Sequence, residues 1–294
     1  MPETVAAAAS APAQEAPRVL GILAGGGPLP GQVAAAARAA GRRVFMVGLD
    51  GNADPAVLAP WPHEVIGITN PGRILASLRK FGCEDLVMIG PVRRPSLLGH
   101  RPDAEGVRIL ARIGRAAFAG DDGLLAAVVK VLGEEGFRII GAQDVLREAL
   151  GPPGLLTRFG PDALAMADIR RAAAVARALG AVDVGQGCVV QQGMVLALEA
   201  AEGTDAMLAR CGPLARPGPG GVLVKLLKPG QERRTDLPTI GPQTIRNAAA
   251  AGLRGVAFEA GSTILAERAA AVAAADAAGL FLLGLDPETV SRGE

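Results

Sequence analysis

The sequence predicts an α/β protein of two domains, the first with a Rossmann-like parallel sheet and the second with a mixed sheet. In the first half, apolar strand patterns alternate with helical patterns, which is the order that builds a parallel sheet covered by helices on both faces. Around Gly193, two adjacent apolar strands indicate a hairpin in the second half. A length of 294 residues suits two domains, and residues 150–161 concentrate proline and glycine between them.

The first domain is expected over residues 18–150, after a disordered, Ala/Pro-rich tail at 1–17. A helix of the first domain should begin at Asp121 or Asp122, since either side chain can cap it. The remaining elements come from hydrophobic periodicity. We expect strands at 18–24, 43–49, 64–68, 85–89 and 137–140, and helices at 29–40, 71–81 and 104–117.

A linker at 151–161 leads to the second domain, which we expect over 162–285 before a tail at 286–294. Its elements also follow the hydrophobic pattern. We expect strands at 187–192, 194–199, 222–227, 255–259 and 280–283, helices at 162–179, 204–210, 242–251 and 263–278, and a loop at 213–220.

Composition excludes several classes of function. A net charge of +1, seven Phe, one Trp and no Tyr argue against a nucleic-acid partner, which would need basic and aromatic surfaces. Two His and three isolated Cys leave no His- or Cys-based metal site and fit a reducing compartment. We see no signal peptide and no run long enough to cross a bilayer, which predicts a cytoplasmic protein whose membrane contact is peripheral.

A glycine turn follows the first strand. Gly25 and Gly27 form half of a dinucleotide fingerprint, but Pro30 holds the place of its third glycine. Asp50, after the second strand, stands where a ribose-binding acid would. The turn is therefore either a ligand-facing loop or a plain tight turn, and a nicotinamide-dependent oxidoreductase is one alternative function. Such an enzyme would lack any Tyr as a proton donor.

Acidic residues crowd the turn from the strand at 194–199 into the next helix. Glu199, Glu202 and Asp205 lie there with Thr204. Magnesium takes one or two carboxylates together with water and phosphate oxygens, so this turn is a candidate metal site. Helix capping by Thr204 or Asp205 is the competing interpretation.

A second charged segment follows the strand at 222–227. Lys225 interrupts that strand, and Lys228, Arg233 and Asp236 follow within a dozen residues. Cations beside an acid suit a phosphate and its metal ion, and α/β proteins carry such chemistry on loops at strand ends. A solvated loop with surface ion pairs is the alternative.

The most basic region spans residues 93–115. Arg108, Arg112 and Arg115 share one face of its predicted helix. A basic amphipathic helix is typical of a membrane surface, although a solvated helix face has the same pattern.

Several stretches together resemble one family. They are LAGGGPLP (23–30), MIGPVRRP (88–95), GDDGLL (120–125), VVQQGMVLALEAAEGTDAML (189–208), VKLLKPGQERRTDLPTIGPQTI (224–245) and GVAFEAGSTI (255–264). The chain is similar, over residues 18–285, to the two-domain, magnesium-dependent UDP-2,3-diacylglucosamine pyrophosphatases of Gram-negative bacteria. The resemblance implies hydrolysis of UDP-2,3-diacylglucosamine to UMP and 2,3-diacylglucosamine 1-phosphate (lipid X) in lipid A synthesis.

The resemblance places the essential acid at Asp236, inside an R-x-D-x-P motif. We expect Asp236 to bind Mg²⁺ or activate water, with Glu199, Glu202 or Asp205 completing the metal site between the domains. The expected substrate contacts are Gly25, Gly26, Gly27, Arg93, Asp122, Gln192, Thr204, Lys225, Lys228, Arg233 and Thr239. An inner-membrane surface and a second copy of the chain are further expected partners, and a non-catalytic lipid carrier is the remaining alternative function.

Overall fold

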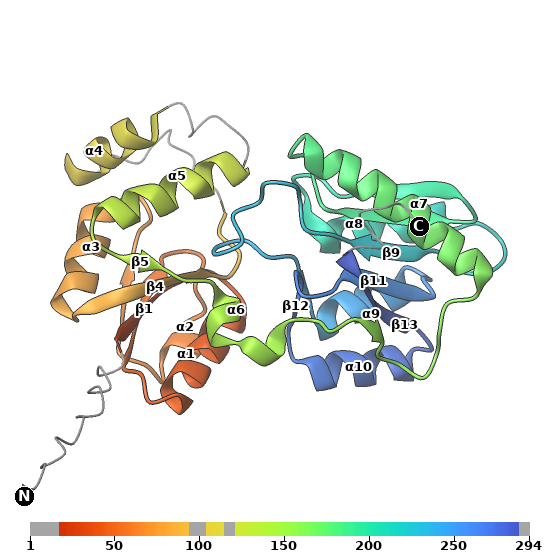
Figure 1. Ribbon diagram of the computed structural model, residues 1–294, viewed down its shortest axis with the longest axis horizontal. Helices are drawn as coiled ribbons and strands as arrows, with labels where there is room; N and C mark the ends of the chain where they lie inside the picture. The colour runs from red at the N-terminus through yellow and green to blue at the C-terminus, as the bar shows by residue number, and fades with distance from the viewer. Residues whose placement is uncertain (1–17, 94–103, 115–120, 288–294) are drawn as a thin grey trace, which may run out of the picture.

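The computed structural model describes residues 18–93, 104–114 and 121–287. Figure 1 shows two α/β domains side by side, joined by the chain that follows α6 and by a long loop reaching from the second domain toward the first. Each domain has its own sheet. The predicted fold class is thus confirmed.

The first sheet is entirely parallel, and its strand order is β3-β2-β1-β4-β5. The chain starts in the middle and winds outward in both directions, so the order reverses between β1 and β4, where such folds bind their ligands. The strands are β1 (Val19–Ala24), β2 (Val44–Leu49), β3 (His63–Ile66), β4 (Cys83–Ile89) and β5 (Arg138–Ile139).

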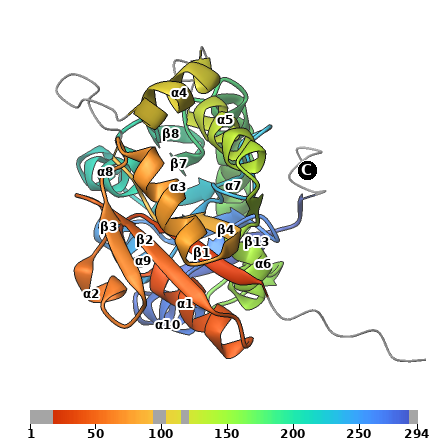
Figure 2. The ribbon, with the colours of Figure 1, turned by 90° about the vertical axis from the view of Figure 1, so that its left-hand side faces the viewer.

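Alternation along β1 sends side chains to both faces of this sheet. Leu20 and Ile22 pack with α1 (Leu29–Ala39) on one face, beside α6 (Ala142–Val145). Leu23 packs on the other face, with α3 (Pro71–Lys80) and α5 (Asp121–Glu134). Figure 2 shows helices on both sides of the sheet. The other helical segments are α2 (Pro55–Leu58), α4 (Ala104–Ile113) and η2 (Arg147–Ala149).

The second sheet is mixed, with strand order β6-β13-β11-β9-β7-β8. Its three central strands, β13, β11 and β9, are parallel, and antiparallel strands flank them on both sides. The strands are β6 (Gly154–Leu155), β7 (Gly187–Gln191), β8 (Met194–Leu198), β9 (Val222–Lys225), β11 (Gly255–Glu259) and β13 (Phe281–Leu285).

Helices cover both faces of this sheet as well. The small residues of α7 (Ala163–Ala181) pack on the face that carries Val222 and Val224. On the opposite face, Leu223 and Phe258 pack against three helices. These are α8 (Gly203–Cys211), followed by η3 (Gly212–Leu214), α9 (Pro242–Ala250) and α10 (Arg268–Ala277). Cys83, Cys188 and Cys211 are buried free thiols.

The domains share an apolar contact. A two-stranded parallel ladder joins β10 (Thr239–Ile240) to β12 (Ile264–Leu265). Leu237 and Ile264, which flank or belong to this ladder, lie in the same buried cluster as Ala24 of β1. The loop seen between the domains in Figure 1, residues 226–238, is called the strap below.

Two expected elements differ from the structure. Residues 151–161, expected as a linker, supply β6, which pairs with β13. The helix expected over 263–278 begins only at Arg268, because Ile264 and Leu265 pair with β10 instead. The expected tail at 1–17, the end of the helix at 115–117 and residues 288–294 lie outside the described residues. Within the described ranges, no helix is both long and apolar enough to cross a membrane.

Candidate functional site

The strap begins where β9 ends, at the carboxyl ends of three parallel strands. Its first turn runs from Lys228 to Gln231, closed by a 3.2 Å hydrogen bond from Gln231 N to Lys228 O. Pro229 fixes φ at the second position, and Gly230 adopts φ 82° at the third. This pattern is typical of a type II turn, in which only glycine fits the third position without strain.

Gln231 holds Asp236 in place. The Gln231 side chain is buried, with 6% of its surface exposed. Its Oε1 accepts a 3.0 Å hydrogen bond from Lys228 N, and its Nε2 donates to Asp236 Oδ2 at 2.5 Å. The two contacts use both ends of the amide, so the Asp236 carboxylate is tied to the backbone of the turn.

Glu232 and Arg234 shape the turn that carries Asp236. The Glu232 carbonyl accepts hydrogen bonds from Thr235 N and Asp236 N, at 3.0 and 3.1 Å. The Glu232 carboxylate binds Arg234 through Nε at 2.8 Å and Nη2 at 2.7 Å. The hydrogen bond from Arg234 lowers the pKa of Glu232 despite its partial burial. Glu232 and Arg234 therefore pair with each other, as the surface-loop interpretation expected, while Asp236 pairs with neither.

A buried polar chain lies behind the strap. Lys225, 7% exposed, donates from Nζ to Thr204 Oγ1 at 2.8 Å and to Thr239 O at 3.2 Å. Thr204 in turn donates to Glu199 Oε1 at 2.6 Å. Because the Thr204 proton goes to the carboxylate, its lone pairs receive the ammonium. These four predicted residues thus come together, from β9, β10, α8 and the end of β8.

Glu199 is 6% exposed, and its second oxygen, Oε2, has no hydrogen-bond partner within the described ranges. A Cβ atom on Gly187 would lie 2.7 Å from this oxygen, closer than real contacts allow. Glycine at position 187 therefore makes room for the carboxylate. A buried carboxylate linked through one hydroxyl to a buried ammonium forms a fixed, mutually compensating pair.

Cations line the outer side of the strap's first turn. Lys228 is 9% exposed and binds Asp183 Oδ1 at 2.6 Å. Arg233 is exposed and reaches Ser262 Oγ at 3.2 Å and Gly261 O at 3.3 Å. Both residues border a cavity of about 480 Å³.

The predicted glycine turn lies at the carboxyl end of β1. Gly25 N and Gly26 N donate at 2.9 Å to Ile89 O and Pro91 O, next to the end of β4. A Cβ atom on Gly25 would lie 2.4 Å from Gly90 O, so close backbone packing requires this glycine. Gly27 has φ 75° and open space beside its Cα. These glycines are explained by packing and turn geometry, and a ligand contact remains a prediction.

Arg93 belongs to the same edge of the first sheet. Its backbone N donates to Asn52 Oδ1 at 2.8 Å, which ties the segment after β4 to the loop after β2. Asp122 lies within the first turn of α5, which begins at Asp121, so the predicted N-cap role of either residue stays a prediction, and the side chain of Asp122 is outside the described part of the chain.

The predicted metal carboxylates are not brought together. Glu202 pairs with Arg210 at 2.7 Å, and Asp205 accepts from Asn247 at 2.7 Å, both on the protein surface. The described residues contain no group of three or more His, Cys, Asp or Glu side chains placed to hold a metal ion. Glu202 and Asp205 are close in the sequence but bind different partners, because α8 begins between them at Gly203.

Gln192 lies at the other end of the second sheet from Lys225. Gly187 of β7 pairs with Lys225, whereas Val190 pairs with Val222, so Gln192 continues past the opposite end of β9. Its backbone N donates to Asp168 Oδ2 at 2.9 Å, and its side chain binds Pro217 O. Gln192 therefore lies apart from Lys225, and its expected contact with the substrate stays a prediction.

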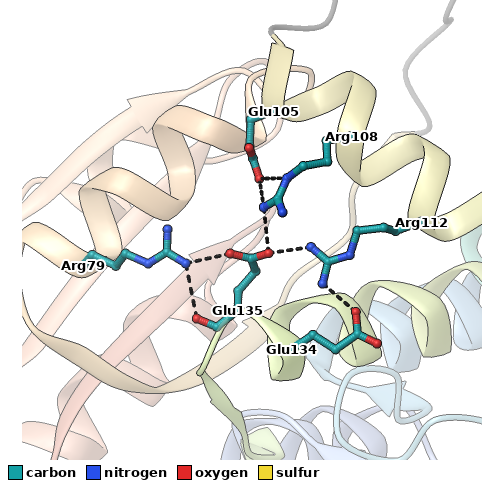
Figure 3. Close-up of polar contacts among 6 residues, drawn as sticks. All are labelled: Arg79, Glu105, Arg108, Arg112, Glu134 and Glu135. Atoms are coloured by element: carbon teal, nitrogen blue, oxygen red, sulfur yellow. Dashed lines mark hydrogen bonds and ion pairs between the residues drawn. The ribbon is translucent and has the colours of Figure 1, made fainter.

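The basic face of α4 is occupied by ion pairs within the first domain. Figure 3 shows Arg108 and Arg112 of α4 turned toward Glu135 at the end of α5, with Arg79 of α3 on its other side. Glu135 receives Arg79 at 2.7 Å, Arg108 at 2.9 Å and Arg112 at 2.5 Å. Hydrogen bonds from Arg112 and then Arg79 lower the pKa of Glu135 to about 2. These arginines hold α4 in place through ion pairs within the first domain, which neither the membrane-surface nor the solvated-face interpretation predicted. Arg115 is outside the described residues.

Known proteins match both domains. A family model described as the LpxI N-terminal domain matches residues 19–149, and one described as the LpxI C-terminal domain matches 152–283. The chain is 46% identical over 277 residues to the UDP-2,3-diacylglucosamine pyrophosphatase LpxI of Caulobacter vibrioides, covering 92% of this chain and 99% of that relative. The chain belongs to the LpxI family. Its membership matches the sequence resemblance, and nothing in the comparisons favours a nicotinamide enzyme.

The residues around Asp236 suit a magnesium ion held by one carboxylate, since the described residues offer no set of three or more acidic ligands, and the ion itself stays a prediction. Mg²⁺ is commonly held by one or two carboxylates together with substrate phosphates and water. Asp236 is half-buried, and Gln231 engages its Oδ2. Sequence reasoning missed Gln231 as a site residue, although its place in the KPGQ turn, five residues before Asp236, is the signal that could have found it.

Proposed function

We propose that this chain hydrolyses the pyrophosphate bond of UDP-2,3-diacylglucosamine, giving UMP and 2,3-diacylglucosamine 1-phosphate in lipid A synthesis. The observation that carries the proposal is the 46% identity, over nearly the full length of both chains, to a relative named for that activity. The strap adds support, because Gln231 ties the Asp236 carboxylate to the turn that carries Lys228, at the carboxyl ends of parallel strands.

The reaction breaks one P–O bond of the P–O–P bridge while the oxygen of water bonds to that phosphorus. The two protons of water are left to the products and the medium. Charge builds up on the phosphate oxygens, so positioned cations supply most of the catalysis. We assign this role to Lys228 and Arg233, which border the cavity, and to Lys225, fixed by Thr204.

Asp236 is the residue that would hold Mg²⁺ in this proposal. The bound ion would supply charge neutralisation at the phosphate oxygens and a site for water. Gln231 orients the carboxylate through one oxygen and leaves the other oxygen to face its ligand. Glu199 stays with Thr204 and Lys225 as a positioning group.

The test is UMP release from UDP-2,3-diacylglucosamine by the purified protein, followed by chromatography, with mass spectrometry of the lipid product. We expect turnover with Mg²⁺ and its loss in Asp236→Asn or after chelation. Asp50→Asn is the matched control, because Asp50 is exposed and is the acid that a nicotinamide enzyme would use. A wild-type protein that binds the lipid but releases no UMP would overturn the proposal and favour a lipid carrier.

We further propose that the enzyme acts at the cytoplasmic face of the inner membrane, since a substrate with two acyl chains resides in a bilayer. The paired arginines of α4 are not the contact in this proposal, because Glu134 and Glu135 compensate them. Sedimentation with liposomes tests the membrane contact, and sedimentation velocity of the purified protein tests the expected homodimer.

A further inference from the structure

The cavity beside the strap lies at the carboxyl ends of the parallel strands of the second sheet. Its wall includes Leu226 after β9, Glu259 at the end of β11 and Pro287 after β13. A volume of about 480 Å³ falls in the range of small-molecule sites. The place and the size both suit a ligand.

Three basic side chains line this cavity, and one of them, Arg177 of α7, was not predicted from the sequence. The Nη2 atom of Arg177 is buried and has no hydrogen-bond partner among the residues that the structure describes. No carboxylate in the described ranges pairs with Arg177 or Arg233, whereas Lys228 has Asp183. Arg177 is half-buried, and a buried guanidinium N–H group that has no acceptor is costly, so an anion that accepts from it in the cavity would relieve that cost.

Phosphate is the anion that this arrangement fits. A guanidinium presents a planar fork that binds two phosphate oxygens at once, and an ammonium adds a point charge. Arg177 and Arg233 reach the cavity from α7 and from the strap, with Lys228 in the turn between β9 and Arg233.

We propose that this cavity binds a phosphate monoester and that Arg177 is the residue that fixes it. The inference rests on the proposed function for the identity of the monoester, because both products of that reaction, UMP and the sugar 1-phosphate, carry this group. A direct measurement of monoester binding tests this inference independently of turnover.

The experiment is calorimetric titration of the full-length protein with UMP, with N-acetylglucosamine 1-phosphate as a soluble stand-in for the lipid product, and with inorganic phosphate. Arg177→Gln removes the guanidinium. Arg170→Gln is the matched control, since Arg170 is an exposed arginine of the same helix. We expect a monoester to bind the wild type, Arg177→Gln to weaken it about tenfold or more, and Arg170→Gln to change it less than about twofold.

Thermal melting separates binding from a structural role. Without ligand, Arg177→Gln should melt at or above the wild-type temperature, because it removes a buried N–H group that has no acceptor. With the monoester, only the wild type should gain stability. Arg177→Lys, which keeps the charge, should bind with intermediate affinity. The inference is overturned if Arg177→Gln binds the monoester as well as the wild type does, or if the wild type binds no monoester or binds inorganic phosphate alone. A marked loss of stability in Arg177→Gln without ligand would also overturn it.

The two proposals can fail separately. If the wild type releases UMP while Arg177→Gln has unchanged affinity and KM, the cavity inference fails and the function stands. If monoester binding depends on Arg177 but UDP-2,3-diacylglucosamine is not cleaved, the function fails and the cavity inference stands.

Discussion

Replacing Gln231 with methionine should slow the reaction without unfolding the protein. Methionine keeps the length and approximate volume of the side chain but neither donates to Asp236 Oδ2 nor accepts from Lys228 N, contacts of 2.5 and 3.0 Å. A hydrogen bond to a charged group contributes about 1.5–3 kcal/mol. If all of that is felt in the transition state, kcat falls by about 10- to 150-fold.

The assay is UMP release at saturating substrate, repeated over a range of Mg²⁺ concentrations. We expect kcat to fall more than KM rises, and more Mg²⁺ to be needed for half-maximal rate, because the carboxylate that would hold the ion is no longer oriented. Gln243→Met is the control, since Gln243 is exposed on α9 and its side-chain hydrogen bonds, among the residues that the structure describes, go to neighbours on its own helix. An unchanged kcat and Mg²⁺ dependence in Gln231→Met would refute the positioning role.

Two further predictions concern stability and packing. Glu135→Gln should lower the free energy of unfolding at pH 7 by about 1–2 kcal/mol after solvent screening. Hydrogen bonds, that from Arg112 above all, lower the pKa of Glu135 to about 2, so its stabilising contribution is full above its unfolded pKa of about 4.3 and is lost as the pH falls toward 2. Urea titrations of wild type and variant should therefore give the same free energy of unfolding near pH 2. Gly187→Ala should displace Glu199 Oε2, which would lie 2.7 Å from the added Cβ, and should reduce turnover. Gly133→Ala is the control: position 133 faces open space within α5, so this variant should be more stable by about 0.5–1 kcal/mol and keep its turnover. Equal activities for the two glycine variants would contradict the close approach at Gly187.

The alternation of strands and helices was readable because long apolar periods dominate each element. The misses are short pairings that only tertiary structure creates. Residues 264–265 read as the start of a helix because helix-forming residues follow them, yet β10 lies alongside and turns them into a strand. Residues 154–155 sit among prolines and glycines, and pairing with β13 makes them a strand.

The candidate site shows the same division. Charge density along the sequence predicted the strap and the Glu199 turn, because both are local. It could not show that Lys225 reaches Thr204, 21 residues earlier, or that Glu202 turns away to Arg210. Arg177 gave no signal at all, since an arginine on an Ala-rich helix reads as a solvated side chain until the fold places it beside the strap.

The strap links the chemistry of the second domain to the position of the first. Leu227 and Leu237, near its two ends, lie in the apolar cluster that includes Ala24 of β1. Between them, Gln143 of α6 donates from Nε2 to Arg233 O at 3.1 Å. Because the segment between these anchors carries Asp236, a rotation of one domain against the other must either break the anchors or move the carboxylate. The orientation of Asp236 is therefore a property of both domains, although Gln231, which hydrogen-bonds its carboxylate, belongs to the second.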